Sequence, residues 1–182
     1  MNNFQTTFRP QQLHPSVWLA PSAIVVGDVT LAEECGVWFN ASLRGDTESI
    51  TIGPRTNIQE GAIFHADPGF PVIVGADVTI GHGAIVHGAR VGDQVVIGMR
   101  ATLLNGSEIG SQSLVGAGSL VTEGKQFPAG VLIVGSPARV LRDLTLEEIE
   151  RNRRAAAIYV QRAIAFRESI TLPPTSLPAN FK

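Results

Sequence analysis

An aliphatic or aromatic residue returns at every sixth position through most of this chain. This period is too long for one face of an α-helix, which recurs about every 3.6 residues, and too short for a hairpin meander, whose turn signals come about every 8–12 residues. Short hexad repeats are typical of β-helices, in which each hexad forms a short strand followed by a tight corner. Three hexads then complete one triangular coil. The residues in phase are Val25, Leu31, Val37, Leu43, Ile52, Ile58, Phe64, Val74, Ile80, Val86, Val91, Ile97, Leu103, Ile109, Val115 and Val121.

The hexad series slips at two places, and each slip reads as an insertion on a corner. The first insertion is Thr47-Glu48-Ser49, and the second is the segment from Ala66 to Pro71, whose prolines and glycine suit an exposed loop. Insertions on corners leave the stacked core undisturbed. We therefore expect an all-β fold, a parallel β-helix over about residues 16–140.

The period changes after residue 137. Thr145 and Glu148 form a capping-box pattern, and the segment carries acidic residues first and arginines later, as helices prefer. We expect a C-terminal α-helix over about residues 146–168 that packs on the β-helix, followed by an extended tail over 171–182. The whole chain, 1–182, is expected to be a single domain. The apolar residues at helical spacing are Leu146, Ile149, Ala156, Val160 and Ile164.

The composition narrows the choice of partners. The 182 residues are 44% hydrophobic and 16% charged, with a net charge of −2 and no basic block. This balance offers no electrostatic reason to expect nucleic acid or an anionic membrane as a partner. No run reaches the roughly 18 apolar residues of a membrane span, and the first residues lack the pattern of a secretory signal, so we expect a cytoplasmic protein.

The single cysteine excludes an internal disulfide bond. Cys35 lies four residues after Leu31, at an inward position of its hexad. We expect it to be buried as a small hydrophobic residue rather than to be a reactive thiol.

Two histidines fall into vertical register. Side chains alternate along a strand, so the residue after an inward position points outward. By this rule Arg44, His65 and His87 lie on one face of the prism, on successive coils about 4.8 Å apart. That spacing suits two imidazoles that bind one zinc ion.

A third histidine, His82, lies at the corner that leads into the strand of His87 and leaves the prism in another direction. Zinc is tetrahedral, and a catalytic site keeps three protein ligands and one open position. We therefore predict a homotrimer in which His65 and His87 of one subunit share a metal with His82 of its neighbour. Fe²⁺ and Co²⁺ also accept imidazole ligands. The plainer interpretation makes these histidines surface or interface hydrogen-bonding residues, which is how we interpret His14.

Three motifs carry a resemblance to a known family: Arg44-Gly45-Asp46, then residues 57–61 with His65 following, and residues 80–88 with His82 and His87. Together they resemble the gamma-class carbonic anhydrases and their ferripyochelin-binding-protein-like relatives, which are left-handed hexapeptide β-helices. The resemblance covers nearly the whole chain. It implies a left-handed trimer with zinc held between subunits by His65, His82 and His87.

The resemblance also suggests roles for nearby polar residues. Arg44 and Asp46 would pair across the subunit boundary, or Arg44 would hold bicarbonate. Gln59, supported by Asn57, would orient a metal-bound hydroxide or CO2 through its amide, whereas the alternative role for both is to stabilise a corner. Tyr159 on the C-terminal helix would either extend its hydroxyl to the site or serve in packing.

The implied reaction is reversible hydration of CO2 to bicarbonate by a metal-bound hydroxide, because zinc lowers the pKa of water from 15.7 to about 7. Thr47 stands where the family's founding pattern has a glutamate, and the short segment 66–71 replaces a long acidic loop. Glu48, Glu60 and Asp67 are the candidates for proton transfer, and their spacing does not select among them.

Two other functions remain open from the sequence. A hexapeptide acyltransferase would use an acyl-coenzyme A thioester and one histidine as general base, but the pairing of His65 with His87 argues against it because one base suffices. A trimeric scaffold that binds metal without turnover would share every feature described above.

Overall fold

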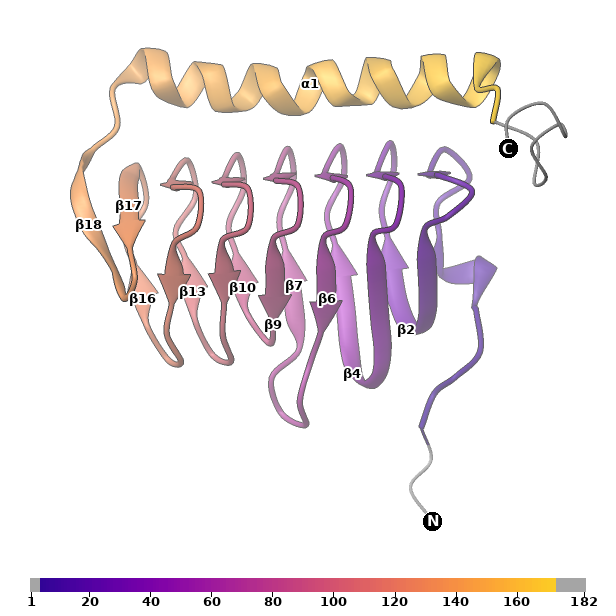
Figure 1. Cartoon of the computed structure of the whole chain (residues 1–182), viewed down its shortest axis with the longest axis horizontal. Coiled ribbons are helices and arrows are strands. Elements are labelled where there is room, and N and C mark those ends of the chain that lie inside the picture. Colours follow the sequence, from indigo (N-terminus) through magenta and orange to yellow (C-terminus); the bar gives the residue numbers. More distant parts are fainter. Residues whose placement is uncertain (1–3, 173–182) are drawn as a thin grey trace, which may run out of the picture.

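The computed structural model describes residues 4–172 of the chain, so the tail expected over 171–182 lies from residue 173 on outside the described residues. The chain winds as a solenoid of short strands, and one long helix runs along the side of the solenoid (Figure 1). The prediction of an all-β hexapeptide β-helix with a C-terminal helix is confirmed. Within residues 4–172, no helix is both long enough and apolar enough to span a bilayer.

The elements follow the hexads in chain order. Their bounds are η1 Pro10–Gln12, β1 Trp18–Leu19, β2 Ile24–Leu31, β3 Gly36–Val37, β4 Ser42–Ile52, β5 Asn57–Ile58, β6 Ile63–His65, β7 Val72–Val74, β8 Thr79–Ile80, β9 Ile85–His87, β10 Arg90–Val91, β11 Val96–Ile97, β12 Thr102–Leu103, β13 Glu108–Ile109, β14 Leu114–Val115, β15 Leu120–Val121, β16 Gln126–Phe127, β17 Val131–Gly135, β18 Ala138–Asp143 and α1 Leu146–Ser169.

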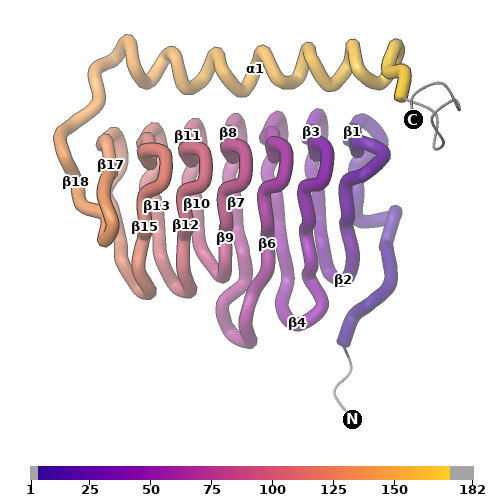
Figure 2. The backbone as a smooth tube through the Cα atoms, viewed as in Figure 1, coloured from indigo at the N-terminus to yellow at the C-terminus, as the bar shows by residue number. Residues whose placement is uncertain are grey.

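Strands of successive coils stack in parallel, as the tube in Figure 2 shows. One sheet has the order β1-β3-β5-β8-β11-β14-β17-β18, and only its last pair, β17 with β18, is antiparallel. The other sheet has the order β15-β12-β9-β6-β4-β7-β10-β13-β16 and covers the remaining two sides of the prism, because β4 runs from one side to the next. Each hydrogen-bonded row therefore carries equivalent residues of successive hexads.

The first insertion lies where the chain turns a corner, as expected, but it does not end the strand. Thr47, Glu48 and Ser49 lie inside the continuous strand β4, between its pairing with β6 and its pairing with β7. Gly27 of β2 pairs with Gly45, and Val29 pairs with Ile50, so the segment between Gly45 and Ile50 bulges opposite Asp28. The neighbouring strand β2 turns the same corner and supplies pairing partners, which is why β4 continues through it.

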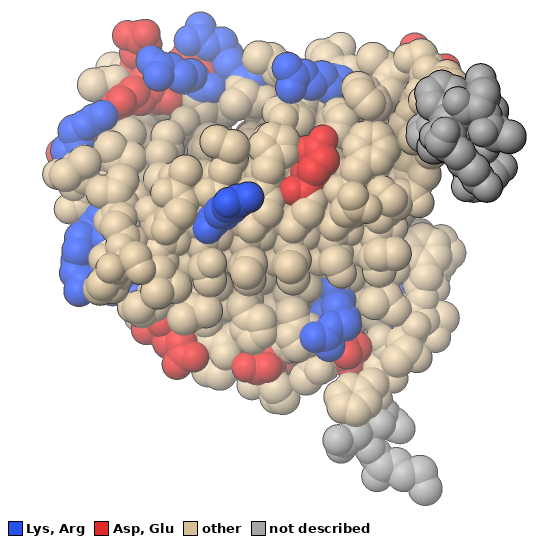
Figure 3. Space-filling view, in the orientation of Figure 1, with Lys and Arg blue, Asp and Glu red and all other residues tan. Residues whose placement is uncertain are grey.

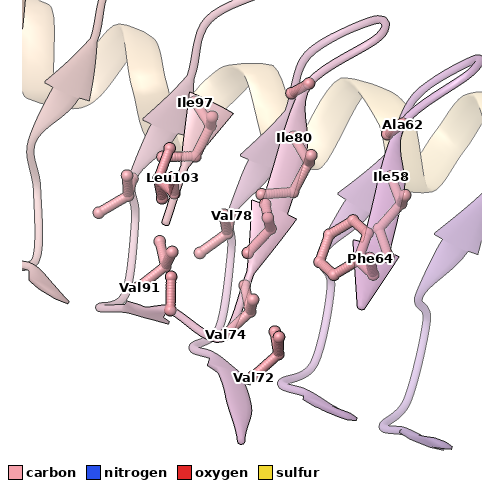
Figure 4. Packing of buried hydrophobic residues seen from close by; sticks show 14 of the residues in the cluster. Ile58, Ala62, Phe64, Val72, Val74, Val78, Ile80, Val91, Ile97 and Leu103 are labelled. Atoms are coloured by element: carbon pink, nitrogen blue, oxygen red, sulfur yellow. The ribbon is translucent and has the colours of Figure 1, made fainter. Parts of the chain in front are cut away.

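The hexad residues form the core. All of the positions in phase are buried except Val25, which is partly buried against the same cluster. Phe64, Ile58 and Ile80 are completely buried and point into the interior of the solenoid (Figure 4). Burial of each such side chain contributes roughly 1.5–3 kcal/mol relative to exposure, so the repeat itself supplies the stabilising interior.

Helix α1 begins with the predicted capping box. The Thr145 side chain accepts a hydrogen bond from the Glu148 N–H, and the Glu148 carboxylate accepts one from the Thr145 N–H. The helix packs on β1, β3, β5 and β8 (Figure 1). Its C-terminal half joins an aromatic cluster around Trp38, which contacts Tyr159 and Phe166 edge to face. The helix thereby covers the side of the prism opposite the β6–β7 loop.

Cys35 is 1% exposed, as the hexad phase predicts, and its thiol donates a hydrogen bond to the carbonyl of Gly53 at 3.1 Å. Burial raises the pKa of this thiol to about 11, above its ordinary value of 9.0. The folded state thus favours the neutral thiol and loses stability only as the pH rises above 9.0.

We expect Cys35 in the native protein to resist iodoacetamide at about pH 8, because the thiolate is the reactive form and is disfavoured by burial. The unfolded protein should be alkylated at the rate of a free peptide thiol. Mass spectrometry of the timed reaction measures both rates, and equal rates in the two states would contradict the burial of this thiol.

Candidate metal centre

His65 and His87 lie side by side on adjacent strands. They are paired in register between β6 and β9, as the hexad phase predicts, and their ring centroids are 5.1 Å apart. Nδ1 of His65 lies 3.1 Å from Nε2 of His87. The imidazoles therefore direct one nitrogen each towards a common point.

The other nitrogen of each ring faces an acceptor. Nε2 of His65 lies 3.1 Å from a carboxylate oxygen of Asp46, and Nδ1 of His87 lies 2.8 Å from the amide oxygen of Asn105. Since both partners are acceptors, each of these nitrogens carries the ring proton when the imidazole is neutral. These tautomers leave a lone pair on each of the two nitrogens that face each other, an arrangement that is stable only with a shared cation or proton between them.

This donor set fits a divalent metal ion. Tetrahedral zinc with Zn–N bonds of about 2.0–2.1 Å separates two of its ligand nitrogens by about 3.3–3.4 Å. The observed separation of 3.1 Å between the two imidazole nitrogens is close to that edge. Among residues 4–172, a third possible donor is Asp67, since ligand atoms of His65, Asp67 and His87 lie within 4.8 Å of one another.

His82 does not join this pair within its own chain. It occupies the corner between β8 and β9, where its Nδ1 lies 2.6 Å from a carboxylate oxygen of Glu60 and its side chain is 46% exposed. The glycines on both sides of His82 belong to this tight corner. The exposed part of the imidazole is therefore accessible to another molecule.

Three of the predicted residues, Asn57, Gln59 and Tyr159, lie on the His82 side of the chain. Gln59 and Tyr159 line one open groove with His82, between the β-helix and α1. Nε2 of Gln59 donates to Oδ1 of Asn57 at 3.2 Å, and Nδ2 of Asn57 donates to the Thr79 hydroxyl at 2.9 Å. These bonds orient the buried Gln59 amide, leaving its oxygen free to act as an acceptor at the groove.

Arg44 and Asp46 pair within the single chain, and a pair across the subunit boundary stays a prediction. Nη1 of Arg44 donates to Oδ2 of Asp46 at 2.6 Å, because residues two apart on a strand point to the same side. Burial alone raises the pKa of Asp46, but hydrogen bonds from Arg44 and His65 outweigh it and hold the pKa below its ordinary value. The carboxylate therefore remains an acceptor for His65 at neutral pH.

The three proton-transfer candidates have separate surroundings. Both carboxylate oxygens of Glu48 accept backbone N–H bonds, from Ser49 and Gly69, so this side chain anchors the 66–71 loop. Glu60 contacts His82 at 2.6 Å, and Asp67 accepts from Asn105 at 2.9 Å. Glu48 is therefore a structural residue, whereas the other two touch the candidate site.

Sequence reasoning missed Asn105, although a signal was present. Asn105 lies two residues after the inward Leu103, which stacks on Val86, so it occupies the corner one coil beyond His87. The contact with His87 depends on the side-chain conformation at that corner, which the hexad phase does not specify.

The fold defines the class of protein. A family model described as "Hexapeptide repeat of succinyl-transferase" matches residues 71–103 and 88–123. A solved structure described as a hexapeptide transferase family protein from Anaplasma phagocytophilum superposes with a TM-score of 0.82 at 32% identity, covering 85% of this chain and 91% of that one. The chain is a hexapeptide-repeat protein.

Relatives narrow the class further. A protein of Methanocaldococcus jannaschii named "Probable carbonic anhydrase" is 46% identical over 80% of this chain and 92% of its own length. "Gamma carbonic anhydrase 2, mitochondrial" of Arabidopsis thaliana is 39% identical over 81% of this chain and 55% of its own length. The chain belongs to the gamma-class carbonic anhydrase family, and thus to a family of enzymes.

Proposed function

We propose that this protein is a zinc-dependent carbonic anhydrase that interconverts CO2 and bicarbonate at the subunit interfaces of a homotrimer. The observation that carries the proposal is the convergence of His65 Nδ1 and His87 Nε2 at 3.1 Å, while both outer ring nitrogens face acceptors. Two neutral imidazoles in this arrangement form half of a tetrahedral zinc site. Fe²⁺ and Co²⁺ are the other ions that suit these ligands.

The third ligand in this proposal is His82 of a neighbouring subunit. His82 leaves its own prism at a different corner, in the groove that also contains Gln59 and Tyr159. A neighbour that brings His82 to the His65–His87 pair would bring Gln59 and Tyr159 with it. Each complete site would then join the His65–His87 face of one subunit to the His82 face of its neighbour. Because the two faces differ, the contact is head-to-tail, and such contacts can close into a ring.

A row of three isoleucines and one serine beside the histidines supports burial of this face. Ile24, Ser42, Ile63 and Ile85 follow one another in register on successive strands. Ile24 is 56% exposed and Ile63 is 47% exposed in the single chain. Uncharged residues make up most of the face seen in Figure 3, although basic and acidic side chains also lie near its centre. Such surfaces are typical of protein–protein contacts.

The residues of this chain have distinct tasks in the reaction. A bound zinc ion would supply a water whose pKa is about 7 instead of 15.7, and hence a nucleophile at neutral pH. Asp46 orients His65, and Arg44 holds Asp46 through their ion pair. The amide of Gln59, fixed by Asn57, orients CO2 without adding charge, and Tyr159 lines the same groove.

An acyltransferase fits this geometry less well. A general base needs a lone pair that faces the substrate. The lone pair of His87 Nε2 instead faces His65 at 3.1 Å, and the lone pair of His65 faces it in return. This mutual arrangement suits one shared cation and leaves no imidazole of the pair as an independent base.

The test is metal analysis of the purified protein coupled to oxygen-isotope exchange between CO2 and water. We expect about one zinc ion per chain, exchange above the uncatalysed rate, loss of exchange after chelation and recovery on adding zinc. Bound metal without exchange would leave only the scaffold function. Absence of metal together with retention of acetyl-coenzyme A would favour the acyltransferase.

A further inference from the structure

We infer that Asp67 and Asn105 are positioning residues that set the tautomer of His87 and so prepare its Nε2 to bind metal. The inference rests on the proposed metal site and assigns a task to the 66–71 loop. That loop joins β6 to β7 and forms the excursion seen between them in Figure 1.

Asp67, Asn105 and His87 are linked by two hydrogen bonds, and we call this arrangement the relay. Nδ2 of Asn105 donates to Oδ2 of Asp67 at 2.9 Å, and Oδ1 of Asn105 faces Nδ1 of His87 at 2.8 Å. An asparagine amide alone can turn either its oxygen or its NH2 group towards a neighbour. The carboxylate of Asp67 can only accept, so it draws the NH2 group and leaves the oxygen for His87.

The orientation of the amide then decides where the imidazole proton lies. An oxygen at 2.8 Å from Nδ1 requires the proton on Nδ1, because two acceptors cannot share a hydrogen bond. The lone pair of His87 therefore lies on Nε2, which is the nitrogen that faces His65. A flipped amide would favour the opposite tautomer and place an N–H where the metal belongs.

The surroundings hold the relay in place. Gly88 has a φ of +57°, and a Cβ at this residue would lie 2.2 Å from Oδ1 of Asn105. The same Cβ would lie 2.8 Å from Cβ of Phe70, and a Cβ at Gly106 would lie 3.3 Å from the Phe70 ring. Phe70 thus packs over two glycines that leave room for it and for the amide.

The far end of the loop is also anchored. Oε2 of Glu48 accepts from the Gly69 N–H at 3.0 Å, and the Phe70 N–H donates to the carbonyl of Asp67 at 3.0 Å. The loop therefore presents the exposed Asp67 carboxylate to Asn105 in a defined position. His65 needs no relay, since the carboxylate of Asp46 reaches its Nε2 directly.

The decisive experiment first removes each polar side chain of the relay and then exchanges the Asp and the Asn between positions 67 and 105. Loss of such an outer partner typically lowers metal affinity by about 10–100-fold. We expect Asn105→Leu to weaken zinc binding by about 10–100-fold and Asp67→Leu by about 10-fold. The swapped double variant Asp67→Asn with Asn105→Asp should stay within about threefold of the wild type, because residue 105 still accepts from His87 and residue 67 now donates.

The matched control is Gln112→Leu. It removes an exposed hydrogen bond, away from the histidines, in which Nε2 of Gln112 donates to Oε1 of Gln94 at 3.1 Å. Zinc affinity is measured against a competing chelator with the trimer intact. Circular dichroism confirms that each variant is folded.

A second readout separates positioning from mere structural support. Long-range ¹⁵N–¹H correlation spectra of metal-free protein, recorded at about pH 8.5 where an ordinary histidine is neutral, report which ring nitrogen of His87 carries the proton. We expect the Nδ1–H form in the wild type, the swapped variant and the control, and its loss in Asn105→Leu.

An unchanged tautomer in Asn105→Leu would overturn the inference, whether or not zinc binding falls. If the wild type binds no zinc, the proposed function fails, but the tautomer of His87 in the metal-free protein still decides whether the relay exists.

Discussion

His87→Ala is expected to abolish zinc binding and to reduce CO2 hydration to the uncatalysed rate, while the protein stays folded. The substitution removes one of the two nitrogens that converge at 3.1 Å, and a single imidazole with one neighbour's histidine leaves zinc short of the three protein ligands of a catalytic site. The ring points outward from the solenoid, next to the buried Val86, so no core cavity forms. The free energy of unfolding of the metal-free protein should change by no more than about 0.5–1 kcal/mol. Metal content after dialysis and oxygen-isotope exchange are the two measurements.

His14→Ala is the matched control. His14 lies outside the repeat, and the hydrogen bonds of its exposed imidazole within residues 4–172 go to the Ser16 hydroxyl, at 2.8 Å, and the Ser16 N–H. This variant should keep both zinc and activity. Wild-type zinc content in His87→Ala would contradict the assignment of His87 as a ligand.

Mixing two inactive variants is expected to restore activity. His82→Ala lacks the ligand that each subunit lends to its neighbour, and His87→Ala lacks one of the ligands that each subunit keeps. In a mixed trimer, one interface joins the intact pair of a His82→Ala subunit to the intact His82 of a His87→Ala subunit. The other interfaces stay incomplete, so each mixed ring regains one site.

The size of the recovery follows from the closed symmetry. Equal amounts of the two variants, unfolded and refolded together, produce mixed rings in about three quarters of the trimers, and about one quarter of all sites are then complete. Zinc content and isotope exchange should both rise from background to about one quarter of the wild-type values. Size-exclusion chromatography with light scattering verifies the trimer.

A mixture of His65→Ala with His87→Ala is the control for this experiment. Both substitutions affect the same side of the interface, so no arrangement of subunits completes a site. Recovery in this control, or none in the first mixture, would contradict a site shared between subunits.

The hexad phase predicted the β-helix and most of its interior because the phase is a local property. An inward residue such as Phe64 or Ile80 is buried whatever the distant parts of the chain do, since every coil presents the same inward position. The register of His65 with His87 follows from the same phase, because each is the outward neighbour of an inward residue. The capping box at Thr145 is equally local, since its two hydrogen bonds join residues three apart.

Side-chain contacts between different corners could not be predicted from the sequence. The spacing of Glu48, Glu60 and Asp67 could not rank them, whereas the structure shows Glu48 bound to the backbone of the 66–71 loop. Insertions break the phase, so the positions of their side chains are set by packing alone.

The sequence by itself determined the period of the solenoid, the inward residues, the C-terminal helix and the two histidines that share a face, because each of these follows from the alternation of side chains or from hydrogen bonds between near neighbours. Only the tertiary structure decided which nitrogen of each imidazole is hydrogen-bonded to an acceptor, and that Asn105 and Asp67 form the hydrogen bonds behind Nδ1 of His87. It also showed that His82 lines one groove with Gln59 and Tyr159. These contacts join residues from different coils or from the helix, and their geometry depends on how corners and loops pack, which a repeating pattern does not encode.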